Sequence, residues 1–215
     1  MIKKINLGVL ISGSGGTLQN FIDKIEAGKL NANIHLVISS KSNVAGLGRA
    51  RKHNIPTAVI LRSNYKDTDT FSQAITAELN KYPIDLITLA GFIHLYNIPE
   101  KYKGKVMNIH PGLIPAFCGH NYYGHKVHEA VINYGAKASG CTVHFADNVY
   151  DNGPIIIQRC VPVFEDDIPE TLAARVFKEE CEAYPEAIRL FAEGRLKIEG
   201  RKVRILKPKE IKDEK

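Results

Sequence analysis

Cysteine is scarce in this sequence, and its spacing excludes several classes of protein. The 215 residues include four cysteines, at Cys118, Cys141, Cys160 and Cys181, and no two of them form a Cys-x-x-Cys motif. Disulfide-dependent secreted domains carry denser cysteine patterns, and structural zinc sites need ligands that stand closer together. We therefore expect reduced thiols, no bound metal and a cytoplasmic location.

Long apolar runs and concentrated charge are missing as well. No stretch approaches the ~18 apolar residues that a membrane-spanning helix needs. The formal net charge is +6, but lysine and arginine are scattered along the chain, whereas nucleic-acid binders gather them in stripes with interleaved aromatic residues. We expect small-molecule substrates and no nucleic-acid or membrane partner. The sequence leaves open whether the protein is a monomer or a homodimer.

Apolar segments alternate with amphipathic patterns along the first half of the chain. The segments that we expect to form strands are 5–12, 33–40, 57–61, 84–91 and 105–110. The helices expected between them are 17–27, 44–53 and 67–81. Continuous apolar strands that are joined by helices indicate a parallel sheet covered by helices on both faces.

The last third of the sequence has a different pattern. The elements expected there are a helix at 124–133, strands at 139–146 and 153–163, a helix at 169–193 capped by Asp167, and a hairpin at 195–206 turning at Gly200–Arg201. We predict a single Rossmann-like, doubly wound α/β domain over residues 1–206, with a mostly parallel sheet, a C-terminal hairpin and a charged tail at 207–215. Such sheets bind ligands at the carboxyl ends of their strands.

A glycine-rich loop follows the first expected strand, in the sequence "ISGSGGTLQ" at 11–19. It is neither a Walker A loop, because no Gly-Lys-Ser/Thr closes it, nor a GxGxxG fingerprint, because Leu18 replaces the third glycine. Its backbone N–H groups would point toward a helix N-terminus, which favours an anion such as phosphate. A simple tight turn explains the glycines equally well.

The sequence "VMNIHPGLIP" at 106–115 places an amide and an imidazole at the end of an apolar strand. Asn108 and His110 project to the same side because they are two residues apart. Asn can donate to a developing oxyanion, and His can transfer a proton near neutral pH. Either residue alone could be structural, but the pair favours catalysis. We also expect Ile114–Pro115 to be cis, because the chain must turn sharply here.

Two carboxylates are weaker candidates. Asp151 precedes an apolar strand in "DNVYDNGPIII" at 147–157, where an Asp-Asn-Gly turn is a sufficient explanation. Glu180 falls on the apolar stripe of the last helix, together with Phe177 and Tyr184. A carboxylate on such a stripe needs a partner, a substrate cation or water. A structural salt bridge explains Glu180 as well as a substrate does.

Taken together, these motifs resemble the phosphoribosylglycinamide formyltransferase (glycinamide ribonucleotide transformylase) family of folate-dependent enzymes. The resemblance covers Lys4 to about Leu196, and it rests on "LISGSGGTLQ", "LITLAGF", "VMNIHPGLIPAF", "TVHFADNVYDNGPIIIQ" and "EAYPEAIRLFAEGRL". Asn-x-His-Pro with the distant Asp-x-Gly-Pro loop is specific for the wider formyltransferases. The glycine loop with Gln19 is similar to the glycinamide ribonucleotide branch. The resemblance implies that 1–206 is a formyltransferase catalytic domain.

The resemblance also implies a role for each candidate residue. The catalytic trio would be Asn108, His110 and Asp151, and Glu180 would bind the substrate amine. The residues that would bind the substrate phosphate are Ser14, Gly15, Gly16 and Thr17. Those that would line the folate pocket are Phe92, Ile93, His94, Leu95, Tyr96, Ala146, Asp147, Asn148, Val149 and Tyr150. The glycine loop lacks two side-chain donors that the family commonly has, and the loop after Phe117 is longer than in the best-known members.

The implied reaction is formyl transfer from 10-formyltetrahydrofolate, as co-substrate, to the amino group of glycinamide ribonucleotide in de novo purine biosynthesis. Other folate-dependent formyl enzymes remain alternatives, namely a formyltetrahydrofolate hydrolase or an amino-sugar formyltransferase. A non-catalytic nucleotide- or folate-binding module is a further alternative. The presence of Asn108, His110 and Asp151 together argues against it, because a binding module needs no proton relay.

Overall fold

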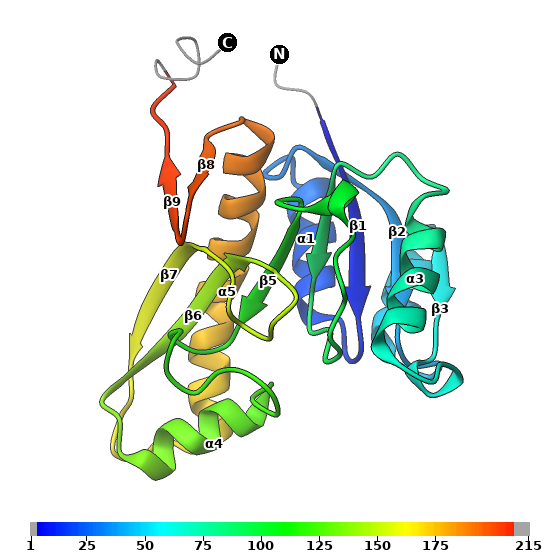
Figure 1. The fold of residues 1–215 in the computed structure, drawn as a ribbon. Helices are drawn as coiled ribbons and strands as arrows, with labels where there is room; N and C mark the ends of the chain where they lie inside the picture. Colours follow the sequence, from blue (N-terminus) through cyan, green and yellow to red (C-terminus); the bar gives the residue numbers. More distant parts are fainter. Residues whose placement is uncertain (1–3, 209–215) are drawn as a thin grey trace. The chain divides into compact units, whose positions relative to one another are not determined.

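The computed structural model describes residues 4–208. Within this range the chain forms two compact units, an N-terminal unit of residues 4–108 and a C-terminal unit that begins at Ile109. Most of the charged tail expected at 207–215 lies outside the described residues. The predicted α/β class is confirmed, because both units contain strands and helices (Figure 1).

The N-terminal unit is built on a parallel sheet. Its strands are β1 (Ile5–Ile11), β2 (Ala32–Ser39), β3 (Thr57–Val59), β4 (Leu86–Leu89) and β5 (Val106–His110), whose last two residues belong to the C-terminal unit. They lie in the order β3-β2-β1-β4-β5, and every neighbouring pair is parallel. The order reverses between β1 and β4, which is where doubly wound sheets bind their ligands.

Helices cover both faces of this sheet, as the sequence predicts. The helices of the unit are α1 (Gly16–Glu26), α2 (Ala45–Lys52) and α3 (Thr68–Leu79), with 3-10 turns η1 (Arg62–Asn64) and η2 (Glu100–Tyr102). A Cβ on Gly8 would stand 2.7 Å from Leu79 of α3, whereas one on Gly46 of α2 would stand 2.6 Å from Ile11. Gly8 and Ile11 lie on opposite faces of β1, because side chains alternate along a strand. The helices α2 and α3 therefore pack against opposite faces.

The C-terminal unit contains antiparallel strand pairs. Its elements are α4 (His125–Tyr134), β6 (Ala138–Phe145), β7 (Ile155–Pro162), α5 (Pro169–Ala192), β8 (Leu196–Glu199) and β9 (Lys202–Ile205). Strand β6 is antiparallel to β7, and β8 to β9, while β9 meets β7 in parallel. The long helix α5 packs on β6, β7 and α4 (Figure 1). The hairpin turns at Gly200–Arg201, as predicted.

Two details of α5 differ from the sequence prediction. The N-cap residue of α5 is Ile168 and not Asp167, which lies one residue earlier. The carboxylate of Asp167 binds the Arg175 guanidinium at 2.7 Å. Phe177, predicted to face inward, is 39% exposed. The buried stripe passes through Val176 and Glu180 instead, and a residue one position away is rotated by about 100° around the helix. The Ile114–Pro115 bond is cis, as predicted.

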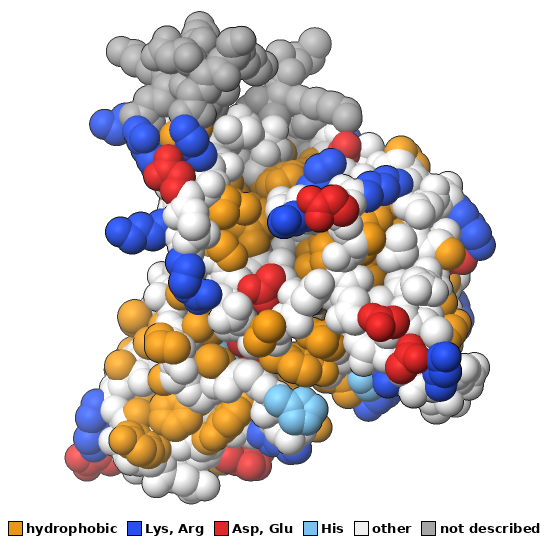
Figure 2. All heavy atoms as spheres, viewed as in Figure 1, with side chains coloured by type: hydrophobic (Ala, Val, Ile, Leu, Met, Phe, Trp, Pro, Cys, Tyr) orange, Lys and Arg blue, Asp and Glu red, His pale blue; other side chains and the backbone are white. Residues whose placement is uncertain are grey.

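Basic side chains are spread rather than gathered on the face that Figure 2 shows. On the face drawn in Figure 2, Lys and Arg form several separated groups. Some are paired with carboxylates, such as Arg159 with Glu186 at 2.8 Å. Within residues 4–208, no helix is both long and apolar enough to span a membrane.

Candidate functional site

The carboxyl ends of three neighbouring strands bring predicted site residues together in the N-terminal unit. The glycine loop follows β1, the segment 90–96 follows β4, and Asn108 of β5 is in register with Leu89. Two hydrogen bonds join the first two segments, from Ser12 N to Gly91 O at 3.1 Å and from Ile93 N to Ser12 Oγ at 3.2 Å. Ser14 and Asn108 therefore lie on the same edge of the sheet, as the sequence predicts.

The glycine loop ends at the N-terminus of α1. Gly15 is the N-cap residue and has a φ of +73°, a left-handed conformation that glycine adopts without strain. The helix begins at Gly16, one residue before the predicted start. No side chain caps this terminus, and its first turn contains no acidic residue. The first N–H groups of a helix lack partners within the helix and carry a partial positive charge, so this end suits an anion.

The segment from Phe92 to Tyr96 is partly buried. Phe92 stacks on Phe71 with ring centroids 6.2 Å apart, and the Tyr96 hydroxyl hydrogen-bonds Thr76 Oγ1 at 2.8 Å. Burial raises the pKa of Tyr96 to about 12. Burial also lowers the pKa of His94, and nearby Arg62 and Lys41 lower it further. Since Phe92 and Tyr96 pack inside the unit, the half-exposed side chains of this segment are those of 93–95.

His110, in the C-terminal unit, has both ring nitrogens next to acceptors. Its side chain is 2% exposed, with Nε2 2.9 Å from the Phe117 carbonyl and Nδ1 3.5 Å from Asp151 Oδ2. A carbonyl oxygen only accepts, so Nε2 carries the proton and donates it. Burial lowers the pKa of His110, outweighing the opposing effects of Asp151 and the Phe117 carbonyl. The imidazole is therefore neutral at neutral pH, with Asp151 beside its unprotonated nitrogen.

Asp151 lies between two imidazoles. Its side chain is 9% exposed, and Oδ1 is 3.7 Å from His144 Nε2. The Gly119 N–H donates to its Oδ2 at 2.9 Å. Burial pushes the pKa of this carboxyl up, but His144, His110 and the Gly119 N–H outweigh it, so the pKa lies below its ordinary value. The carboxylate is therefore ionised at neutral pH. The structure thus brings Asp151 and His110 together, as the family resemblance implies.

A second buried histidine, His144, lies beside Asp151 and is not indicated by any sequence pattern. It lies on β6, is 1% exposed, and has Nδ1 2.9 Å from the Phe145 carbonyl. A single histidine in the apolar strand "TVHFA" gives no signal of its own, because a buried histidine is more often structural. Only its contact with Asp151, in the loop after β6, places it next to the candidate site.

Glu180 is buried on α5. The side chain is 9% exposed, and burial raises its pKa to about 7. Among the described residues, none forms a hydrogen bond or ion pair with its carboxylate. Cys141 lies near enough to feel this carboxylate, since its pKa rises to about 12 mainly through burial and partly through Glu180. A buried carboxylate without a partner is costly, which fits a group that meets a cation brought by a ligand.

The loop from Ala146 to Tyr150 joins β6 to the Asp151 turn. Its backbone is shaped by Asp147, which accepts from Val149 N at 3.0 Å and from Asn152 Nδ2 at 2.8 Å. Val149 is 59% exposed. The ring of Tyr150 lies 5.3 Å from that of His120, in the loop after Phe117. This partly exposed segment therefore lies next to the loop whose Gly119 N–H binds Asp151.

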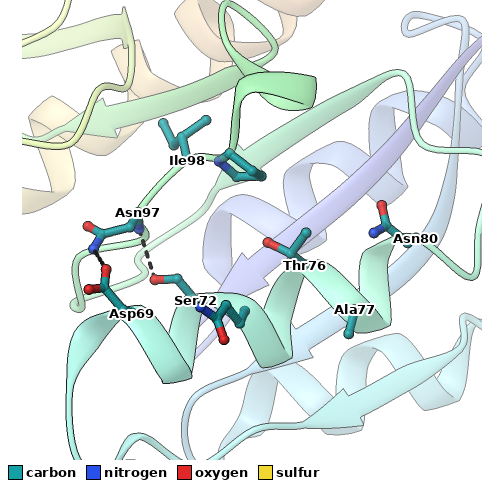
Figure 3. A pocket seen from close by; sticks show the side chains of 9 residues that line it. Asp69, Ser72, Thr76, Ala77, Asn80, Asn97 and Ile98 are labelled. Atoms are coloured by element: carbon teal, nitrogen blue, oxygen red, sulfur yellow. Dashed lines mark hydrogen bonds between the residues drawn. The ribbon is translucent and has the colours of Figure 1, made fainter.

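One surface cavity lies elsewhere in the N-terminal unit. It measures about 410 Å³ and lies between α3 and the segment 97–99 (Figure 3). Asn97 closes one end by bonding Asp69 and Ser72. None of the predicted site residues lines it. Within residues 4–208, no three His, Cys, Asp or Glu side chains are grouped to hold a metal ion.

Comparison with known proteins identifies the relatives of this chain. A family model described as formyl transferase matches residues 5–188. Phosphoribosylglycinamide formyltransferase of Haemophilus influenzae is 39% identical over 92% of this chain and 91% of its own length. The bovine trifunctional purine biosynthetic protein adenosine-3 is 42% identical over 91% of this chain, which spans only 19% of that protein.

Solved structures agree with these sequence matches. The crystal structure of glycinamide ribonucleotide transformylase 1 from Symbiobacterium toebii has a TM-score of 0.87 and 42% identity, with 94% of each chain covered. The phosphoribosylglycinamide formyltransferase of Coxiella burnetii has a TM-score of 0.84 and 34% identity, again with 94% of each chain covered. The matched residues include the strand with Asn108 and His110, the turn with Asp151, and Glu180. This chain belongs to the formyl transferase family.

Proposed function

We propose that this protein transfers the formyl group of 10-formyltetrahydrofolate to the amino group of glycinamide ribonucleotide, a step of de novo purine biosynthesis. The observation that carries the proposal is the buried His110–Asp151 pair, with Nδ1 and Oδ2 3.5 Å apart. A folate- or nucleotide-binding module has no use for a buried imidazole beside an ionised carboxylate. The names of relatives that match this chain over nearly its whole length indicate the acceptor.

The reaction needs an oxyanion to be stabilised and a proton to be moved. The amine nitrogen attacks the formyl carbon, and negative charge grows on the formyl oxygen. Asn108 supplies a neutral N–H donor for that oxygen, and His110, two residues further along β5, projects to the same side of the strand. When the formyl oxygen is bound, the Nε2–H of His110 donates to this oxygen and no longer to the Phe117 carbonyl. The carbon–nitrogen bond to the folate then breaks.

The amine loses one proton in this step, and the folate nitrogen that departs gains one. Asp151 helps the ring of His110 to take up the proton, because an adjacent carboxylate stabilises the imidazolium. His144 is a positioning residue in this proposal, since its contact is with Asp151. The imidazole of His110 can accept a proton only when it is neutral, and Asp151 can stabilise the imidazolium only when it is ionised. The pair starts with both groups in these states.

The remaining residues bind the substrates. The loop Ser14 to Thr17 holds the ribonucleotide phosphate at the N-terminus of α1, and Glu180 meets the substrate amine. The segment Phe92 to Tyr96 and the loop Ala146 to Tyr150 line the pterin pocket, where Phe92 and Tyr96 contribute mainly by shaping the backbone. These partners are small molecules, and we propose no nucleic-acid partner, no metal and no membrane. The cytoplasmic location stays a prediction, because plant relatives are named chloroplastic.

A turnover experiment with several acceptors tests the proposal. Purified protein receives 10-formyldideazafolate with glycinamide ribonucleotide, with an amino sugar, or with no amine, and the products are identified by mass spectrometry. We expect formylated glycinamide ribonucleotide and no free formate. Formate release without an amine would show a hydrolase, and a formylated amino sugar would show a different acceptor. Binding of the folate with no product in any mixture would show a binding module.

A further inference from the structure

Helix α2 binds two successive carbonyl groups of the glycine loop. The Gly46 N–H donates to Gly13 O at 3.2 Å, and Arg49 Nε donates to Ser14 O at 3.0 Å. Neither α2 residue was singled out by the sequence motifs. Both bonds approach the loop from the helix, so two neighbouring carbonyls face α2.

The close contact depends on glycine at both positions. A Cβ on Gly15 would stand 2.6 Å from Gly46 Cα, and a Cβ on Gly46 would stand 3.1 Å from Gly13 O. Because the helix can approach so closely, Arg49, three residues after Gly46, reaches the loop with its guanidinium. Its Nη1 also donates to Gln19 Oε1 on α1 at 3.1 Å. One half-buried arginine therefore links α2, the glycine loop and the first turn of α1.

The hydrogen bonds from α2 fix the direction of the loop N–H groups. In a trans peptide, a carbonyl points opposite to the N–H of the following residue. When Arg49 holds Ser14 O toward α2, the Gly15 N–H must point away from α2. Gly46 fixes the Ser14 N–H in the same way by holding Gly13 O. Within the described residues, Arg49 forms an ion pair with no carboxylate, so its positive charge also remains available to attract an anion.

We propose that Arg49 is a positioning residue for phosphate binding, which orients the loop amides through Ser14 O without contacting the phosphate. The inference rests on the proposed function, because the loop must hold the acceptor's phosphate for Arg49 to matter. The planar guanidinium can bind Ser14 O and Gln19 Oε1 together, whereas a lysine ammonium is a compact charge without that fork. The role therefore requires arginine and not merely a positive charge.

The test compares Arg49→Met and Arg49→Lys with a matched control, Arg51→Met. Arg51 lies on the same helix and is exposed, and its guanidinium forms no hydrogen bond or ion pair with the described residues. Michaelis constants and kcat are measured for glycinamide ribonucleotide, for its dephosphorylated nucleoside and for the formyl donor, together with thermal melting. Wild-type turnover of the ribonucleotide comes first, since its absence would overturn the proposed function rather than this inference.

We expect both Arg49 variants to raise the KM for the ribonucleotide roughly tenfold or more. A loop N–H that no longer points at the phosphate loses one charge-assisted hydrogen bond to it. The kcat, the KM for the formyl donor and the KM for the nucleoside should stay near wild type, and Arg51→Met should change none of them. A wild-type KM in Arg49→Lys would show that charge alone suffices and would overturn the inference. So would an equal rise for the nucleoside. If Arg49→Met does not fold, Arg49→Lys still decides.

Discussion

Replacing Asp151 with asparagine tests the proposed proton transfer most directly. Asparagine has nearly the same volume, and it tolerates the left-handed backbone that Asp151 adopts at a φ of +50°. Its carboxamide oxygen can still accept the Gly119 N–H. The change therefore removes the negative charge beside His110 and leaves most of the local structure intact. We expect turnover to fall steeply while folate binding and melting temperature change little.

The magnitude follows from the distance between the two groups. Asp151 Oδ2 lies 3.5 Å from His110 Nδ1, and both side chains are at most 9% exposed. With an effective dielectric constant of about 20, opposite charges at this distance attract by roughly 5 kcal/mol, which is an upper limit for the net effect. Each 1.4 kcal/mol corresponds to about a tenfold change in rate, so kcat should fall by about 10³-fold.

The pH dependence should shift in a defined direction. Asp151 opposes the lowering of the His110 pKa that burial causes, so removing its charge lowers that pKa further. If the neutral imidazole is the active form, activity is lost as pH falls through the His110 pKa. The acidic limb of kcat/KM should therefore move to lower pH in the variant.

The assay measures kcat and kcat/KM against pH, with dissociation constants for a folate analogue and thermal melting. Asp166→Asn is a suitable control, because Asp166 is an exposed aspartate in the same unit. Near-wild-type turnover in Asp151→Asn would refute the proton-transfer role, since asparagine forms turns at least as well as aspartate. A matching loss in the control would trace the effect to net charge.

Three further changes give separate tests. Glu180→Gln should raise the acceptor's KM about tenfold or more and leave folate binding unchanged, because it removes the charge that meets the ammonium; equal losses for both ligands would indicate a structural role. Gly15→Val should raise the acceptor's KM and lower the melting temperature, because its Cβ would stand 2.6 Å from Gly46 Cα and its φ is +73°; unchanged values would place the phosphate elsewhere. His128 is buried and its pKa falls to about 4, through burial first and then through His125 and His110. The unfolded chain binds that proton near pH 6.5, so stability should be full above 6.5 and decline toward pH 4. Denaturant titrations at several pH values should show a flatter decline in His128→Gln, and an identical slope would contradict this assignment.

The local pattern of the sequence was enough to predict most elements. Apolar runs and amphipathic stretches place the strands and helices within a few residues, because their spacing reflects burial on one or both faces. Gly200–Arg201 also predicts the hairpin turn locally, because glycine adopts turn conformations without steric cost. The prediction of a cap at Asp167 was wrong because its carboxylate binds Arg175, a partner that spacing alone does not indicate. Phe177 was misplaced because adjacent residues on a helix differ by about 100° in direction.

The sequence alone predicted several residues of the candidate site. Asn108 and His110 share one side of a strand by period, and the glycines before α1 indicate an anion site by composition. Only the tertiary structure showed that His144 lies beside Asp151. The path of the loop between β6 and Asp151 decides this contact, and the spacing of the two residues in sequence does not predict that path. The tertiary structure alone also showed that Arg49 binds the glycine loop. This contact depends on the close approach of Gly46 on α2 to Gly15 in the loop. Chain periodicity is a local property, whereas the orientation of a peptide N–H or the pKa of an imidazole depends on neighbours that folding brings from elsewhere.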